Sequence, residues 1–136
     1  MEKKIIKTQN APAAVGPYSQ AVVCDNFVFC SGQLGMEPST GLHFPSQKCT
    51  KIEGDVRKQT EQCLKNLTAV LKEAGTDLSH ALKVTVYLKD MNKFAEMNEV
   101  YSSFFPENPP ARTCIEAARL PKNAMVEIDI IANLPG

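Results

Sequence analysis

Ala124-Met125-Val126-Glu127-Ile128-Asp129-Ile130-Ile131-Ala132 is the stretch that decides the fold. Apolar and charged residues alternate along it, which is the pattern of a β-strand with one buried face. We expect one face, formed by Val126, Ile128 and Ile130, to meet helices. The opposite face then carries Met125, Glu127, Asp129 and Ile131. The stretch therefore predicts a sheet covered by helices on one side, with two carboxylates on the other side.

A second strand is predicted at residues 113–118, directly after Pro110-Ala111-Arg112. We assign Thr113, Ile115 and Ala117 to the helix side, so alternation places Arg112, Cys114 and Glu116 on the other side. If the last two strands form a hairpin, we expect the numbers of opposite residues to add up to about 241. This register places Cys114 opposite Glu127 and Arg112 opposite Asp129. Arg112 then lies diagonal to Glu127, with the two Cα atoms roughly 7–8 Å apart.

A guanidinium and a carboxylate on one rigid sheet wall favour a site for a small carboxylate-bearing substrate. The fork of donors on Arg112 would bind that carboxylate, and Glu127 would handle a proton or a water. Two plainer interpretations stay open, since Arg112 could form a surface ion pair with an acid and Cys114 could be a small buried residue. The face is too apolar to leave in water, so we expect a neighbouring subunit to cover it.

The remaining elements complete an α+β sandwich, with two helices on one face of a mixed β-sheet and one domain over residues 1–136. Helical spacing predicts a helix at residues 53–74, stopped by Gly75, and Asp90 can cap a second helix at residues 91–105, closed by Pro106. Strands are predicted at residues 4–8, 21–25, 27–31 and 82–88, and a loop after Gly35 runs to about Lys51.

The composition excludes several classes of protein. Fifteen basic and fifteen acidic residues give a net charge of zero, which argues against charge-driven binding to nucleic acid or membranes. No apolar run is long enough to span a bilayer, and the first residues lack a signal-peptide pattern. The five cysteines include no CxxC pair, so we expect reduced thiols and no metal site. We expect a cytoplasmic protein and leave a mitochondrial pool open.

Five motifs in register resemble the RidA/YjgF family of enamine/imine deaminases. They are Gly16-Pro17-Tyr18-Ser19-Gln20, Ser31-Gly32-Gln33, Asn98-x-x-Tyr101, Pro110-Ala111-Arg112-Thr113-Cys114 and Ala118-Arg119-Leu120-Pro121-Lys122, followed by Glu127-Ile128-Asp129. The resemblance implies a chorismate-mutase-like α+β fold and a homotrimer with clefts between subunits. It also implies that 2-iminobutanoate, 2-iminopropanoate and their enamine tautomers, released by pyridoxal-phosphate-dependent dehydratases, are hydrolysed to 2-oxo acids and ammonia without a cofactor.

The same resemblance assigns roles to individual residues. Arg112 would bind the substrate carboxylate, Glu127 would position or activate the attacking water, and Cys114 would line the pocket. Four more residues, with Tyr101 as a weaker addition, would complete the cleft: Tyr18, Ser31, Gly32 and Asn98. From the residues alone, Tyr18 could equally be a packing aromatic and Asn98 a solvated helix residue.

Two other functions remain as alternatives. Members of the family are also described as translation inhibitors with endoribonuclease activity, although zero net charge and the lack of an aromatic-basic motif do not favour RNA binding. A trimer that binds 2-oxo acids or shields client proteins without turnover is the third interpretation.

Overall fold

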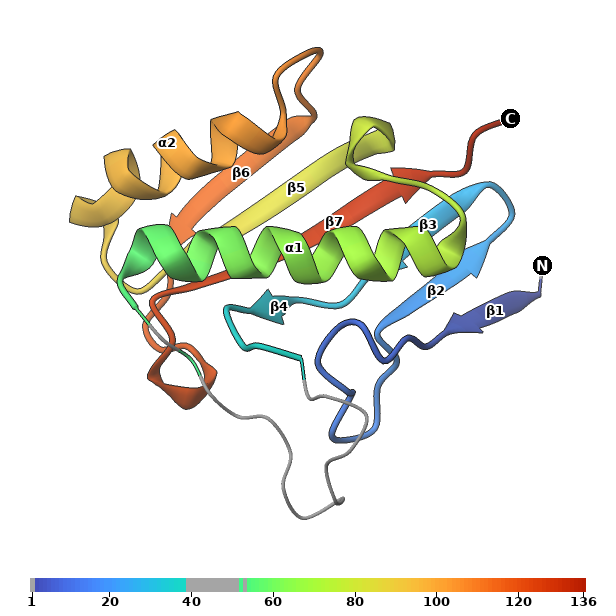
Figure 1. Cartoon of the computed structure of the whole chain (residues 1–136), viewed down its shortest axis with the longest axis horizontal. Helices are drawn as coiled ribbons and strands as arrows, with labels where there is room; N and C mark the ends of the chain where they lie inside the picture. Colours follow the sequence, from blue (N-terminus) through green and yellow to red (C-terminus); the bar gives the residue numbers. More distant parts are fainter. Residues whose placement is uncertain (1, 39–51, 53) are drawn as a thin grey trace.

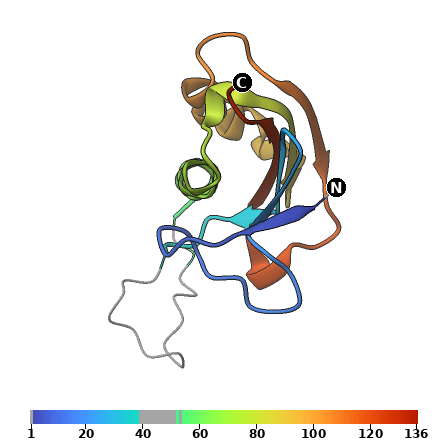
Figure 2. The same cartoon turned by 90° about the vertical axis from the view of Figure 1, so that its right-hand side faces the viewer.

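The computed structural model describes residues 2–38, 52 and 54–136. Within them, seven strands form one mixed sheet in the order β1-β2-β3-β7-β5-β6, and the short β4 also pairs with β7. The strands are β1 (Lys3–Ile6), β2 (Ala21–Cys24), β3 (Phe27–Cys30), β4 (Gln33–Leu34), β5 (Ala81–Leu88), β6 (Ala111–Glu116) and β7 (Val126–Asn133). Helices α1 (Val56–Ala74) and α2 (Phe94–Phe104) lie on the same side of the sheet (Figures 1 and 2). The predicted loop to about Lys51 lies largely outside the described residues.

Helix α1 begins and ends where its capping residues require. The Asp55 carboxylate accepts a hydrogen bond from the Lys58 amide, and Gly75 adopts the left-handed conformation at φ 96°, donating its amide to the last turn. One face of α1 is buried against the sheet, including Cys63, Leu64 and Leu67. The predicted helix and its stop at Gly75 are therefore confirmed, with the first turn starting at Val56.

Helix α2 begins with a tighter turn. The Asp90 side chain accepts from the Asn92 amide and caps a 3₁₀ turn at Met91–Lys93, which continues into α2. Met97 and Tyr101 form the buried side of α2. The second predicted helix and its cap are confirmed.

The face assignment of β7 is also confirmed. Val126, Ile128 and Ile130 have no exposed surface and pack under the helices, while Glu127 and Asp129 lie on the opposite face. Strand β5 runs antiparallel to β7, with Tyr87 opposite Glu127. Strand β4, which was not predicted, brings Leu34 to the other side of Glu127.

The predicted hairpin of the last two strands is wrong. Strand β6 pairs in parallel with β5, so β5 separates β6 from β7. In this register Arg112 lies beside Val84 and Cys114 beside Val86, and both valines are fully buried on the helix side. Arg112 and Cys114 therefore face the helices. The cause is α2, because a helical crossover returns the chain in the same direction as the strand it left.

Further face assignments are also wrong. Glu116 is in register with the buried Leu88 and accepts from the Met91 amide, so it lies on the helix side as well. Thr113 and Ile115 point away from the helices, and Ile115 is 45% exposed. Met125 lies before β7, donates its amide to Gln59 of α1 and packs against the main core. The open face of the sheet thus keeps Glu127 and Asp129 but lacks Arg112, Cys114 and Met125.

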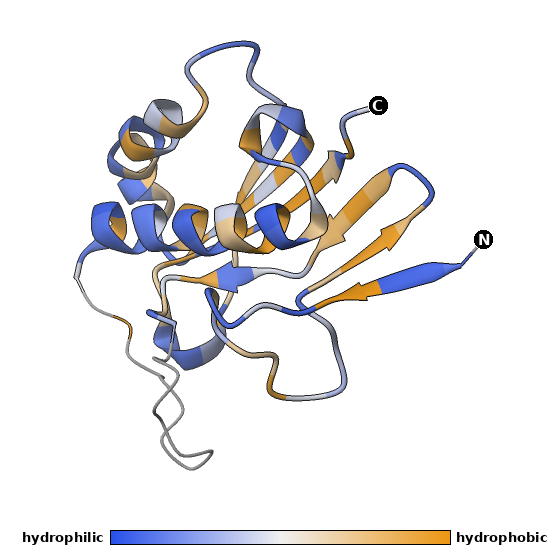
Figure 3. Cartoon of the chain, turned by 45° about the vertical axis from the view of Figure 1, so that its right-hand side comes forward, coloured by the Kyte–Doolittle hydropathy of each residue, from blue (hydrophilic) through white to orange (hydrophobic). Residues whose placement is uncertain are grey.

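The open face still carries several large apolar side chains. Ile5, Phe27 and Phe29 are 52%, 45% and 42% exposed, and Ile115 joins them from the far edge of the sheet. Strands β2 and β3 are hydrophobic along most of their length (Figure 3), and neither α1 nor α2 covers this side (Figure 2). Coverage by a neighbouring subunit stays a prediction. No helix in the described part of the chain could span a membrane.

Candidate functional site

Four of the residues singled out from the sequence line one cavity of about 490 Å³. Glu127 reaches it from β7, Ser31 and Gly32 from the segment between β3 and β4, and Tyr18 from the segment before β2. We call this the Glu127 cavity. Tyr18 is 51% exposed, and its hydroxyl accepts a hydrogen bond from the Val15 amide at 3.4 Å.

A buried glutamine fixes one wall of the Glu127 cavity. The Gln20 side chain is 3% exposed; its Oε1 accepts from the Thr8 amide at 2.7 Å. Its Nε2 donates to the carbonyls of Thr8, Ala11 and Pro12 at 3.1, 3.4 and 2.8 Å. One side chain thus satisfies backbone groups that lack a partner strand there. The segment carrying Pro12 and Ala13 is held as a rigid wall.

Ser31 is tied to the same region. Its amide donates to the Gln20 carbonyl at 2.9 Å, and its hydroxyl donates to the Ser19 carbonyl at 2.6 Å. Because the hydroxyl hydrogen is already used, Ser31 can offer a ligand only an acceptor oxygen.

Gly32 lies directly against the Glu127 carboxylate. A Cβ atom at this position would be 3.0 Å from Cδ and 3.2 Å from Cγ of Glu127, and closer still to Oε2. The backbone of Gly32 is not in the left-handed region, so the glycine is needed for space, not for conformation. The carboxylate occupies the volume that any other side chain would fill.

The surroundings of Glu127 favour its protonated form. Partial burial, together with the negative charge of Asp129, raises the pKa of the Glu127 carboxyl. The Tyr87 hydroxyl donates to Asp129 Oδ2 at 3.1 Å, so Asp129 has a partner on the same face. A carboxyl with a raised pKa is better matched to accepting a proton near neutral pH.

The other three site residues form a separate group under α2, the Arg112 cluster, which consists of Phe94, Asn98, Tyr101, Arg112 and Cys114. Arg112 Nη1 donates to Asn98 Oδ1 at 2.7 Å. The guanidinium carbon lies 4.7 Å from the centroid of the Tyr101 ring and 5.4 Å from that of Phe94. Arg112 is therefore held by α2. The alternative of a surface ion pair is not met among the described residues, where Arg112 lies on the helix side, away from Glu127 and Asp129.

Cys114 fits a structural side chain better than a nucleophile. It is half-buried and packs against the main core. Burial raises the pKa of its thiol, although the nearby Arg112 charge opposes this. The thiol therefore stays protonated, and nucleophilic attack requires the thiolate.

The Glu127 cavity and the Arg112 cluster lie on opposite faces of the sheet. Arg112 is in register with Val84 on the helix face, whereas Glu127 is in register with Tyr87 on the open face. Neighbouring residues of a strand point to opposite sides, so the two groups cannot meet within one chain. The expectation that one sheet wall carries both Arg112 and Glu127 is wrong.

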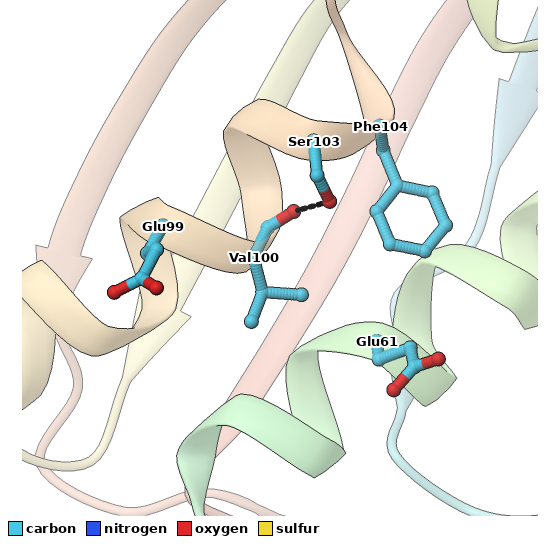
Figure 4. A pocket seen from close by; sticks show the side chains of 5 residues that line it. All are labelled: Glu61, Glu99, Val100, Ser103 and Phe104. Carbon is cyan, nitrogen blue, oxygen red and sulfur yellow. Dashed lines mark hydrogen bonds between the residues drawn. The ribbon is translucent and has the colours of Figure 1, made fainter.

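A second hollow, of about 480 Å³, lies between α1 and α2 (Figure 4). Glu61 reaches it from α1, and Glu99, Val100, Ser103 and Phe104 from α2. The Ser103 hydroxyl donates to the Val100 carbonyl, and Glu99 pairs with Arg57 at 2.8 Å. This hollow contains none of the residues that the sequence predicted for the site. Among the described residues, no three His, Cys, Asp or Glu side chains are grouped to hold a metal ion.

Comparison with known proteins identifies the family. A family model described as Endoribonuclease L-PSP matches residues 8–134. The chain belongs to the RidA/YjgF family.

Individual RidA/YjgF relatives agree along nearly the whole chain. The 2-iminobutanoate/2-iminopropanoate deaminase of Rattus norvegicus is 45% identical over 130 residues, covering 96% of this chain and 89% of its own. The crystal structure of the YjgF product of E. coli is 41% identical with a TM-score of 0.85, covering 96% and 98% of the two chains. That of E. coli TdcF with bound serine is also 41% identical, with a TM-score of 0.86 and coverage of 97% and 99%. The predicted arrangement of two helices on a mixed sheet is confirmed.

Reasoning from the sequence missed three residues of this RidA/YjgF chain that shape the two groups. Gln20 was part of a quoted motif but had no assigned role. Phe94 was not singled out, and Tyr101 was only a weak candidate. A signal was present, because Phe94, Asn98 and Tyr101 are spaced by four and three residues and therefore share one side of a helix.

Proposed function

We propose that this protein hydrolyses 2-imino acids, such as 2-iminobutanoate and 2-iminopropanoate, and their enamine tautomers to 2-oxo acids and ammonia. The observation that carries the proposal is Glu127, a partly buried carboxyl with a raised pKa that borders a cavity. A second group, Arg112, is held by a neutral amide and keeps its charge for a ligand. The relative from Rattus norvegicus, 45% identical, is named as a deaminase of this kind.

The complete site is proposed to form between two copies of the chain. One copy would supply Arg112, Asn98 and Cys114, and its neighbour would supply Tyr18, Ser31, Gly32 and Glu127. This arrangement is supported by the separation of the two groups on opposite faces and by the apolar open face. Because each copy would present one surface and receive a different one, the contact would be head-to-tail, and such a contact makes a ring when its rotation closes. We propose a ring of three, a homotrimer.

In the proposed reaction Arg112 binds the substrate carboxylate through paired N–H donors. The imine carbon is electrophilic when its nitrogen is protonated, so a water held by Glu127 attacks the protonated imine while Glu127 accepts one proton from the water. The resulting carbinolamine carries a hydroxyl and an amine on one carbon. Glu127 returns its proton to the amine nitrogen, and the C–N bond breaks with its electron pair staying on nitrogen. The Glu127 carboxylate then takes the hydroxyl proton and passes it to the departing ammonia, which leaves the 2-oxo acid and ammonium. The reaction is a hydrolysis without net oxidation or reduction. A carboxylate clamp, a positioned water and one proton acceptor are therefore sufficient.

The direct test is release of ammonia and 2-oxo acid from a dehydratase acting on serine or threonine, with and without this protein. Wild type should accelerate the release, and Arg112→Ala and Glu127→Gln should each lose that acceleration while staying folded. Arg57→Ala is the matched control, since Arg57 lies on α1 and pairs only with the exposed Glu99 among the described residues. Full activity in Arg112→Ala would overturn the assigned clamp.

A complementation experiment tests the division of the site. Arg112→Ala and Glu127→Gln are each expected to be inactive, yet dissociating and reassociating a mixture should restore activity. In a head-to-tail ring, each mixed ring holds one interface where both intact groups meet. Mixed oligomers that form and stay inactive would show that the site is not shared.

The alternatives have less support. An RNA-directed activity has a net charge of zero against it, and the sequence has no aromatic-basic motif in its favour. The dehydratase assay distinguishes the deaminase from a protein that only binds 2-oxo acids. A protein that only binds would show affinity for 2-oxo acids without accelerating the release of ammonia. We propose a cytoplasmic location, where the released intermediates would arise.

A further inference from the structure

One side of α2 contacts Arg112 through three successive side chains. Phe94, Asn98 and Tyr101 lie one turn apart on the same stripe of the helix. The guanidinium carbon is 5.4 Å from the centre of the first ring and 4.7 Å from that of the second, and the Asn98 oxygen accepts from Nη1 between them. Both ring distances are within the range of a cation–π interaction.

These partners orient the guanidinium without neutralising it. No carboxylate of the described residues forms an ion pair with Arg112, and Asn98 takes one of its five N–H donors. The two rings attract the cation through their faces and use no donor. The positive charge and most donors therefore remain for a ligand, which is what a carboxylate clamp needs. A glutamate in place of Asn98 would hold the side chain but cancel its charge.

Tyr101 acts through its ring. It is 5% exposed, stacks on Phe105 at 4.7 Å, and its hydroxyl has no hydrogen-bond partner among the described residues. Burial raises the pKa of Tyr101 to about 12, with Arg112 opposing the shift, so the phenol stays neutral and does not exchange protons in the reaction. The contact of Tyr101 with the proposed site is the one that its ring makes with Arg112.

We propose that Phe94 and Tyr101 are positioning residues that hold the guanidinium of Arg112 in the orientation that binds a substrate carboxylate. The inference rests on the proposed function only in taking Arg112 as the carboxylate clamp. The plainer account is that both rings merely fill the space between α2 and β6. The two accounts differ, because simple packing affects stability, whereas positioning affects carboxylate affinity through Arg112.

The test compares Phe94→Leu, Tyr101→Leu and Tyr101→Phe with Phe104→Leu, which removes a ring from α2 away from Arg112. Two quantities are measured for each folded variant: kcat and KM in the dehydratase assay, and the Kd of 2-oxobutanoate by calorimetry. Losing one ring should raise KM and Kd by about tenfold, with kcat changed much less, since a cation–π contact amounts to about 1–2 kcal/mol and 1.4 kcal/mol is tenfold. Tyr101→Phe should restore most of the affinity lost in Tyr101→Leu. Phe104→Leu should leave both quantities near wild type.

Each variant is also combined with Arg112→Ala. If the rings act through Arg112, removing a ring should cause no further loss of affinity in that background. Equal losses with and without Arg112, or equal losses in Phe94→Leu and Phe104→Leu, would overturn the proposal. If Tyr101→Leu does not fold, Phe94→Leu carries the test, because Phe94 is only half-buried.

The outcomes also separate this inference from the proposed reaction. Absence of turnover in wild type, with a Kd that still depends on Arg112 and both rings, overturns the reaction and supports the positioning. A Kd that depends on Arg112 but not on the rings overturns the positioning alone. A Kd and a rate that are the same with and without the Arg112 side chain overturn both the proposed reaction and the positioning role.

Discussion

Gly32→Ala is expected to impair the reaction by displacing Glu127. The new Cβ would lie 3.0 Å from Cδ and 3.2 Å from Cγ, whereas ordinary contact begins at 3.4 Å, and Oε2 is closer still. The carboxylate must therefore retreat by about 1 Å, and a misplacement of that size costs about 100-fold in rate. We expect kcat in the dehydratase assay to fall about 100-fold with KM little changed. The free energy of unfolding should change little, because the atom closest to the new Cβ is the end of a flexible side chain that can move aside.

Gly75→Ala is the matched control for this substitution. Gly75 has φ 96° and open space where a Cβ would lie, so alanine there costs backbone strain at the end of α1, away from Glu127. It should lower stability by about 1 kcal/mol and leave kcat intact. A Gly32→Ala enzyme with wild-type kcat, or a Gly75→Ala enzyme with an equal loss of kcat, would refute the reasoning.

Four further predictions concern the Glu127 cavity and the Arg112 cluster. The activity should fall on the acid side with a midpoint above the 4.5 of an ordinary glutamate, and Asp129→Asn should move that midpoint to lower pH in a pH–rate profile, since the Asp129 charge is a cause of the shift. Because a raised pKa makes the ionised form of Glu127 costly, Glu127→Gln should be thermally more stable than wild type at neutral pH, and the gain should shrink as the pH falls toward 4.5. Gln20→Leu should cost roughly 2–4 kcal/mol in urea denaturation because it leaves four backbone groups unpaired, against about 1 kcal/mol for Gln62→Leu, whose side chain makes one hydrogen bond to Asn66. Tyr101→Phe should raise the free energy of unfolding by about 1 kcal/mol, measured by the same method, because it removes a buried hydroxyl that has no partner in the described structure.

The parts of the fold that depend on local pattern could be predicted. Alternation in β7 gave the correct buried face because the side-chain period of a strand does not depend on its partners. The capping roles of Asp90 and Gly75 are equally local. The two-residue β4 could not be predicted, since it is too short to show a period.

The pairing of strands could not be obtained from the same pattern. The hairpin of β6 with β7 assumed that strands joined by a short connection are neighbours, whereas the crossover through α2 places β6 beside β5. The face of Arg112 was assigned from alternation within its own strand, and that assignment is wrong as well. Within β6 the pattern is weak, because Thr113 and Ile115 on one face are no more polar than Arg112 and Cys114 on the other.

The candidate site was predicted as a set of residues but not as an arrangement. Glu127 and Gly32 meet as neighbours because β4 lies beside β7, a contact that spacing along the chain does not indicate. Asn98 and Arg112 meet because α2 packs over β6. Both are tertiary contacts. The sequence motifs contain the residues that take part in them but do not indicate which residues contact each other.

The fully buried Cys63 provides a built-in reporter for opening of the molecule. Its thiol lies under α1, donates to the Val126 carbonyl next to Glu127, and burial raises its pKa far above neutral. A thiol reagent can reach it only when α1 lifts from the sheet, so the labelling rate of Cys63 measures that event directly. The other four cysteines of the sequence, Cys24, Cys30, Cys49 and Cys114, would be replaced by serine so that the reagent reports Cys63 alone. Lifting of α1 could then be followed in the folded protein without a denaturant.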